Sequence, residues 1–94
     1  MHEQALMKDV MRKVEEVAGE AGAGRVTRVS VRLGPLSHLT PEHFREHFVE
    51  AAGGSLAEGA AVDAVVDDEL TGQRAAGVVV ESVEVELPAE EAAR

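Results

Sequence analysis

The first three residues, Met1, His2 and Glu3, carry donor atoms that together could hold one metal ion. The α-amine of Met1, the imidazole and amide nitrogen of His2, and an amide nitrogen or carboxylate oxygen of Glu3 could close fused chelate rings. Amide nitrogens bind only after losing their protons, which favours Ni(II) and Cu(II), because these ions prefer planar nitrogen ligands and Zn(II) does not. The competing interpretation is that His2 is an exposed residue in front of a helix, since short motifs often occur by chance.

A second candidate is the pair His43 and His47, whose spacing of four residues places both imidazoles on one face of a helix. Such a pair can bind zinc, nickel or copper. Two ligands without a third make a poor metal site, so the competing interpretation is two surface histidines. His38, in the turn before this helix, is the residue that could supply a third ligand.

No other group of residues indicates catalysis. The acidic residues that stand together are expected to face solvent on a loop or on one side of a strand: Asp67, Asp68, Glu69, Glu81, Glu84 and Glu86. Arg28 and Arg32 are expected to lie opposite some of these carboxylates. The serines lack the context of a nucleophile elbow, and the glycines lack the spacing of a phosphate-binding loop. We therefore expect no enzymatic activity.

Composition limits the partners that this chain can have. It contains 18 acidic and 9 basic residues and has a formal charge of −9. This charge disfavours nucleic acids and anionic membranes, because both require a cationic face. The absence of cysteine excludes disulfides and thiolate metal sites. The start of the chain is unlike a signal peptide, and no apolar run approaches the roughly 20 residues of a membrane span, so we expect a cytoplasmic protein.

The elements that must position these residues follow from the hydrophobic pattern. From Gln4 to Ala21, apolar residues recur in steps of three and four, which predicts an amphipathic helix that Gly22 and Gly24 end. From Arg25 to Leu33, apolar and polar residues alternate, which predicts a half-buried strand. Gly34 and Pro35 then stop this strand.

The second half of the chain predicts one helix and two strands. Thr40 and Pro41 are typical of a helix start, and the following turns would bury Phe44, Phe48 and either Ala51 or Ala52. Short strands are predicted at Ala61–Val66 and Val78–Leu87, with a polar loop between them. In the last strand the apolar residues change phase, which a β-bulge near Glu81 or Ser82 would accommodate.

The order helix, strand, helix, strand, strand predicts an α+β fold in which two helices pack on one face of a three-stranded sheet. Ninety-four residues allow one domain, which we expect to span residues 1–87. Residues 88–94 form a small acidic tail that is expected to fray.

Taken together, these segments resemble the HypA/HybF family, the nickel-insertion accessory proteins of [NiFe]-hydrogenase maturation. The similarity runs through nearly the whole chain in five stretches: Met1-His2-Glu3, Arg25–Gly34, Leu36-Ser37 with Thr40-Pro41-Glu42, Leu56–Ala60 and Glu81–Glu86. The resemblance implies that Met1, His2 and Glu3 bind Ni(II) for delivery to the hydrogenase large subunit. It also implies a HypB-like GTPase as a partner, and in some cases service to urease.

The chain departs from this family in one large respect. Family members insert a zinc domain with two CxxC pairs between the last two strands, where this chain has only the segment 67–77 and no cysteine. We therefore expect no structural zinc. Family members also usually carry apolar residues at the positions of His43 and His47. The two histidines are then either a replacement metal contact or the result of sequence drift. Drift is the favoured interpretation. The chain is accordingly a nickel chaperone without a zinc domain or, alternatively, an interaction module that lost metal handling.

Overall fold

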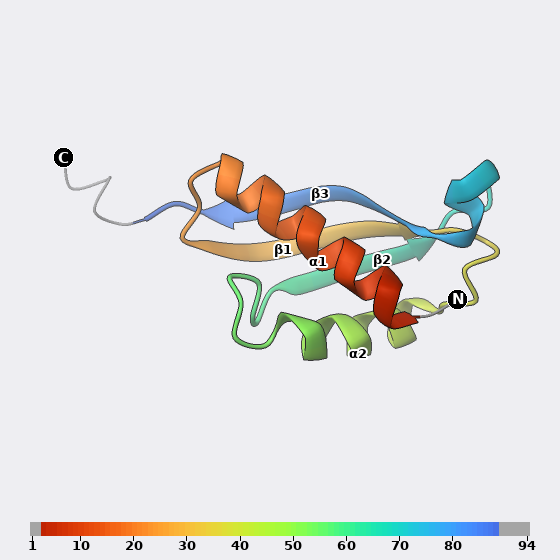
Figure 1. Ribbon diagram of the computed structural model, residues 1–94, viewed down its shortest axis with the longest axis horizontal. Helices are drawn as coiled ribbons and strands as arrows, with labels where there is room; N and C mark the ends of the chain where they lie inside the picture. Colours follow the sequence, from red (N-terminus) through yellow and green to blue (C-terminus); the bar gives the residue numbers. More distant parts are fainter. Residues whose placement is uncertain (1–2, 89–94) are drawn as a thin grey trace.

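A computed structural model of the chain describes residues 3–88 as two layers, a three-stranded sheet and two helices on one of its faces (Figure 1). The elements in chain order are α1 (Glu3–Glu20), β1 (Arg25–Leu33), α2 (Pro41–Ala52), β2 (Ala61–Val66), the 3-10 helix η1 (Gly72–Ala76) and β3 (Val78–Glu86). The predicted α+β class and the order α-β-α-β-β are confirmed. Of the expected acidic tail only Pro88 lies within the described residues, so the domain boundary stays a prediction.

α1 forms because its apolar residues fall on a single stripe. The buried members of this stripe are Met7, Val10, Val14 and Ala18. Their steps of three and four keep them on one side of a helix, where they pack against the sheet and α2. Gly22 follows the helix with φ 68°, a left-handed conformation that glycine adopts without steric cost. Ala21 was expected on the buried stripe but is exposed, because it lies past the end of the helix.

α2 begins at a capped turn. The Thr40 hydroxyl oxygen accepts a hydrogen bond from the backbone N–H of His43 at 3.0 Å, and Pro41 occupies the start of the helix. Phe44 and Phe48, at 0% and 1% exposure, hold the helix on the core with ring centroids 6.0 Å apart. In the part of the chain that the structure describes, no helix is long and apolar enough to cross a membrane.

β1 is the central strand of the sheet. It pairs in parallel with β2 and antiparallel with β3, so the strand order is β2-β1-β3. The parallel pair requires a crossover, which α2 provides. Val29, Val31 and Leu33 point into the core, as the alternation predicts. Val66 and Leu87 share the phase of inward residues of their strands, but both are exposed at or beyond the end of a strand.

A β-bulge in β3 keeps its apolar residues on the covered face. Ser30 pairs with Ser82 and Val31 pairs with Val80, so Glu81 is an extra residue on β3. This is the position at which the change of phase predicts a bulge. The valines on both sides of the bulge pack against the core. The prediction is confirmed.

β1 contains a second irregularity that the sequence pattern did not reveal. Its register with β3 shifts between Val26 and Arg28, so Thr27 has no counterpart. The shift changes the phase of β1, which explains why Val26 and Val29 are both buried although they stand an odd number of positions apart. The odd spacing of Val26 and Val29 is the sign in the sequence that would have indicated this shift, and the alternation from Val29 to Leu33 alone does not include it.

The segment 67–77 between β2 and β3 was predicted as a polar loop, yet it contains η1. η1 lies against the end of β1, where the N–H of Leu36 donates to the carbonyl oxygen of Ala75 at 2.7 Å and that of Gly34 donates to Gly77 at 2.9 Å. A Cβ atom at Gly34 would overlap the carbonyl oxygen of Ala75, so only glycine permits this close approach. The polar composition of the segment concealed the contact.

Candidate metal site

Of the three predicted nickel ligands, the structure describes only one. Met1 and His2 lie outside the described residues, and Glu3 is the first residue of the helix. Packing fixes the helix close to this end, since Met7 and Val10 are only 6% and 3% exposed. A donor set formed by the first three residues would therefore extend from an element that the core holds in place.

The second predicted pair is brought together by α2. The Nε2 atoms of His43 and His47 are 2.8 Å apart, and the two rings stack with an interplanar angle of 19°. The ring centroids are 4.5 Å apart, which exceeds the separation of the Nε2 atoms, so the rings converge toward their Nε2 ends. Both histidines are partly buried. The two Nε2 atoms share a hydrogen bond, in which one ring donates its N–H and the other accepts it.

His38 does not join this pair. It lies in the turn before α2 with φ 63° and is exposed. Across residues 3–88, no three side chains of histidine, cysteine, aspartate or glutamate come together in a way that could hold a metal ion. The suggestion that His38 supplies a third ligand therefore receives no support, since the helix that aligns the other two histidines begins only after Thr40.

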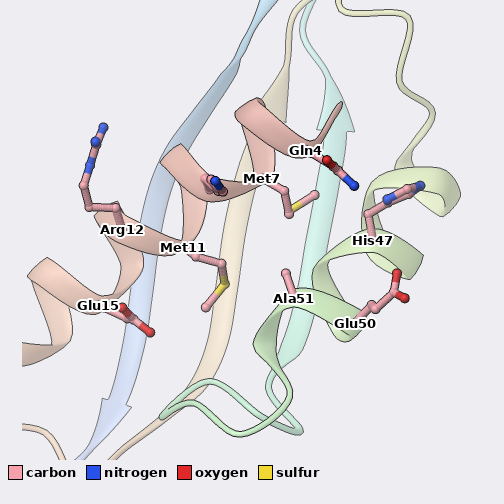
Figure 2. Close-up of a pocket in the computed structure, with 9 residues that line it drawn as sticks. Gln4, Met7, Met11, Arg12, Glu15, His47, Glu50 and Ala51 are labelled. Carbon is pink, nitrogen blue, oxygen red and sulfur yellow. The ribbon is translucent and has the colours of Figure 1, made fainter. Parts of the chain in front are cut away.

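A groove of about 700 Å³ separates α1 from α2 (Figure 2). Met7 and Met11 of α1 and Ala51 of α2 supply its apolar lining. Gln4, in the first turn of α1, lies across from His47 of α2 in this groove (Figure 2). The groove therefore places the beginning of α1 beside the helix that carries the histidine pair, a proximity that the sequence pattern could not show.

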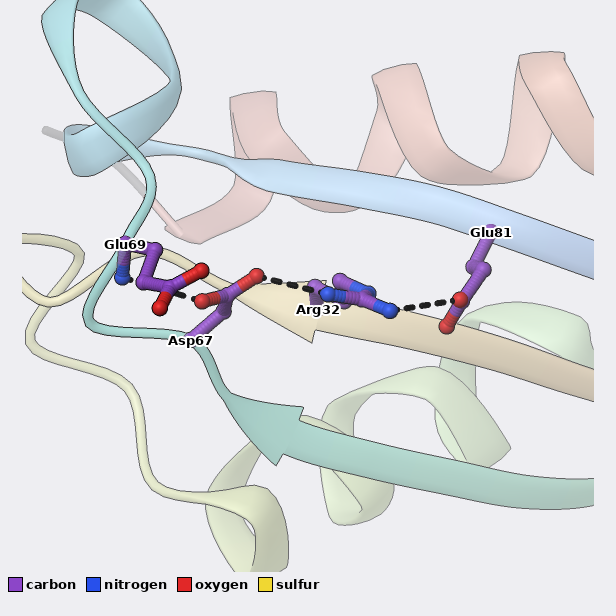
Figure 3. A network of polar contacts seen from close by, with 4 residues as sticks. All are labelled: Arg32, Asp67, Glu69 and Glu81. Carbon is purple, nitrogen blue, oxygen red and sulfur yellow. Dashed lines mark hydrogen bonds and ion pairs between the residues drawn. The ribbon is translucent and has the colours of Figure 1, made fainter.

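The carboxylates on the open face of the sheet are engaged in ion pairs. Arg32 of β1 donates from Nη1 to Asp67 and from Nη2 to Glu81, both at 2.8 Å (Figure 3). Asp67, whose side chain is 14% exposed, also accepts a hydrogen bond from the N–H of Glu69. The hydrogen bonds from Arg32 hold the pKa of Asp67 and of Glu81 below their ordinary values and raise the pKa of Arg32. These groups therefore lie across the strands as charged partners of one another.

The place at which a zinc domain would be inserted is occupied by a short connection. β2 and β3 are joined by residues 67–77, and η1 within this segment packs on the end of β1. The 94 residues contain no cysteine. A zinc domain built on cysteine pairs is therefore absent from this chain, as expected.

Comparisons with known proteins agree with this architecture. A family described as "Hydrogenase/urease nickel incorporation, metallochaperone, hypA" matches residues 1–75. The chain is 43% identical over 65 residues to hydrogenase maturation factor HypA 1 of Bradyrhizobium diazoefficiens, a match that covers 69% of this chain and 58% of that protein. It is 41% identical over 63 residues to hydrogenase maturation factor HypA of Chlorobium limicola, a match that covers 67% of this chain and 54% of that protein. The match thus spans a little over half the length of these curated relatives.

The fold is also that of a solved relative. The solution structure of the Ni metallochaperone HypA from Helicobacter pylori aligns with a TM-score of 0.77, covering 94% of this chain and 100% of that chain, at 18% identity. This likeness concerns the fold alone. The family description names a metallochaperone and not an enzyme, in agreement with the expected lack of catalysis. Because the family match covers residues 1–75 and two relatives are more than 40% identical over at least two thirds of the chain, this chain belongs to the HypA family.

Proposed function

We propose that this chain is a nickel metallochaperone that binds Ni(II) through Met1, His2 and Glu3. The observation that carries the proposal is that the match to a nickel-incorporation family begins at residue 1 and so includes all three residues. Their donor atoms are an amine, an imidazole, amide nitrogens and a carboxylate. Such a set suits a planar Ni(II) centre better than a tetrahedral zinc one.

The packing of α1 against the sheet is consistent with this role. Buried residues hold the helix against the sheet within two turns of its first residue. A metal bound in front of such a helix would be accessible to a partner while its carrier stays fixed. The formal charge of −9 also favours the approach of a divalent cation. Nickel here is cargo, and accessibility matters more for its transfer than burial does.

The names of the relatives support a destination for the nickel. The two curated relatives described above are hydrogenase maturation factors. We accordingly place this chain in [NiFe]-hydrogenase maturation in the cytoplasm, with a HypB-like GTPase and the hydrogenase large subunit as partners. The family description also mentions urease, which makes a urease apoprotein the second client to test.

The test is a calorimetric titration of Ni(II) into protein that begins at Met1 with a free amine. We expect binding at about micromolar affinity or tighter. His2→Ala should weaken binding about tenfold or more, and a short extension before Met1 should do the same, because each removes a ligand from the chelate. His38→Gln is the matched control and should bind like the parent.

Spectroscopy of the nickel-loaded protein identifies the donors directly. A planar low-spin absorption band that disappears in the His2→Ala protein would support the proposed ligands. If neither His2→Ala nor the extension weakens binding, the metal site lies elsewhere. If the parent itself binds no Ni(II), the interaction module becomes the better description.

A further inference from the structure

We propose that His43 and His47 of α2 form a second metal site, in which their two Nε2 atoms bind one Ni(II) or Cu(II) ion. This site goes beyond the N-terminal one, and its existence does not depend on nickel binding by the first three residues. The ligands are both within the described part of the chain, and their relative geometry is known.

The distance between the two donors decides which ions fit. With metal–nitrogen bonds of about 2.0–2.1 Å, two ligands at a right angle are about 2.9 Å apart, and two ligands at the tetrahedral angle are about 3.3 Å apart. The Nε2 atoms of His43 and His47 are 2.8 Å apart. Their separation therefore matches the right angle of planar or octahedral coordination, which Ni(II) and Cu(II) adopt.

Without a metal, α2 holds the two imidazoles together through the hydrogen bond between their Nε2 atoms, and a bound ion would take the place of the shared proton. His43 lies in the first turn, and its backbone N–H donates to the Thr40 cap. Phe44 and Phe48 follow each histidine directly and are fully buried, which fixes the helix face that carries the pair. Preformed donors lose little conformational freedom on binding, so a two-ligand site gains affinity that flexible histidines would lack.

The surroundings of the pair favour a cation. Glu46 and Glu50 lie three residues beyond His43 and His47 on the same helix, so each is a neighbour on the helix surface. His47 also lines the groove between α1 and α2, opposite Gln4 (Figure 2). Both histidines are partly buried, and water would complete the coordination of the bound ion.

The first test is a calorimetric titration of Ni(II) into the His2→Ala protein, in which the proposed N-terminal site is disabled. We expect one remaining site, which His43→Gln weakens about tenfold or more. His47→Gln should weaken it equally, and the double variant should lose little more than either single one, because one imidazole cannot chelate alone. His38→Gln is the matched control and should leave this site unchanged.

A second measurement needs no substitution in α2, and therefore does not depend on the folding of the variants. In NMR spectra of the His2→Ala protein, a small amount of Cu(II) should broaden the imidazole signals of His43 and His47 before those of His38. Equal broadening of all three, or an absence of residual Ni(II) binding, would overturn the second site. The N-terminal proposal is judged separately, by the loss of affinity between the parent and His2→Ala.

Discussion

The two faces of the sheet differ in what holds them. On the covered face, the inward residues of β1 pack beneath both helices at 0 to 1% exposure. On the open face, Arg28 and Arg32 of the same strand are about 42–43% exposed and pair with carboxylates of the neighbouring strands. Alternate residues of β1 thus pack in the core on one face of the sheet and form ion pairs on the other. Among the described residues, neither face holds a candidate metal ligand, since Glu3 begins α1 and the two histidines lie in the first turns of α2.

The open face contributes alignment more than stability. Arg28 lies 2.7 Å from Asp63 of β2 and 3.8 Å from Glu84 of β3, so it joins β1 to both neighbours. Arg32 does the same through Asp67 and Glu81. Exposed ion pairs stabilise little, but a shift of one residue would separate these partners and turn the apolar set away from the core. The comparison teaches that burial stabilises this domain, whereas charge helps to select its register.

The largest effect is expected from a cavity under the covered face. Phe44→Ala should reduce the free energy of unfolding by about 3–5 kcal/mol, because it removes a fully buried ring from the core. Urea denaturation followed by circular dichroism measures the change. Val49→Ala, on the same helix at 61% exposure, is the control and should stay within about 0.5 kcal/mol of the parent. Equal losses in both variants would mean that this core is not the main source of stability.

A smaller effect is expected at the edge of the covered face, where α2 begins. Thr40→Ala removes the acceptor for the N–H of His43 and should lower the free energy of unfolding by about 1 kcal/mol. The same denaturation experiment measures it. Thr71→Ala is a matched control, because Thr71 precedes η1 without a capping hydrogen bond from its side chain. A loss as large in the control would show that the cap is not the cause.

The smallest effect at neutral pH is expected on the open face. Arg32→Gln removes the partner of Asp67 and Glu81 and should lower the melting temperature only slightly, because the side chains of Arg32 and Glu81 are 43% and 47% exposed and water screens their charges. Melting temperatures measured by circular dichroism from neutral to acidic pH provide the comparison. Arg12→Gln is the control, because its ion pair with Asp9 lies within α1 and joins no strands.

The same variant should change how stability depends on pH. The folded state lowers the pKa of Asp67 and Glu81, so their contribution is present above the ordinary carboxylate range and is lost as pH falls through the lowered values. The parent should therefore lose more stability on acidification than Arg32→Gln does. If the melting temperatures of the two proteins fell by the same amount between neutral and acidic pH, the role assigned to Arg32 would be contradicted.

Several features of this protein were determined by the sequence alone. The period of its apolar residues specified α1, α2 and all three strands, because a helix buries residues that recur every three or four positions and a strand buries every second residue. The phase change around Glu81 specified a bulge, since the valines on both sides had to reach one core. The same residues also indicated the fold class and the family. The assignment of a nickel site to Met1, His2 and Glu3 still rests on chemistry and resemblance, because the structure does not describe the first two of these residues.

Tertiary structure alone decided which elements meet. Periodicity shows the face that a strand buries but not its neighbour, so the central place of β1 appears only in the assembled sheet. The close approach of η1 to Gly34 is likewise a contact between distant segments. For His43 and His47, the helical spacing predicted a shared face, whereas their position across the groove from Gln4 depends on how α2 packs beside α1. Local spacing acts through the geometry of one element, but proximity between elements depends on the packing of the whole core.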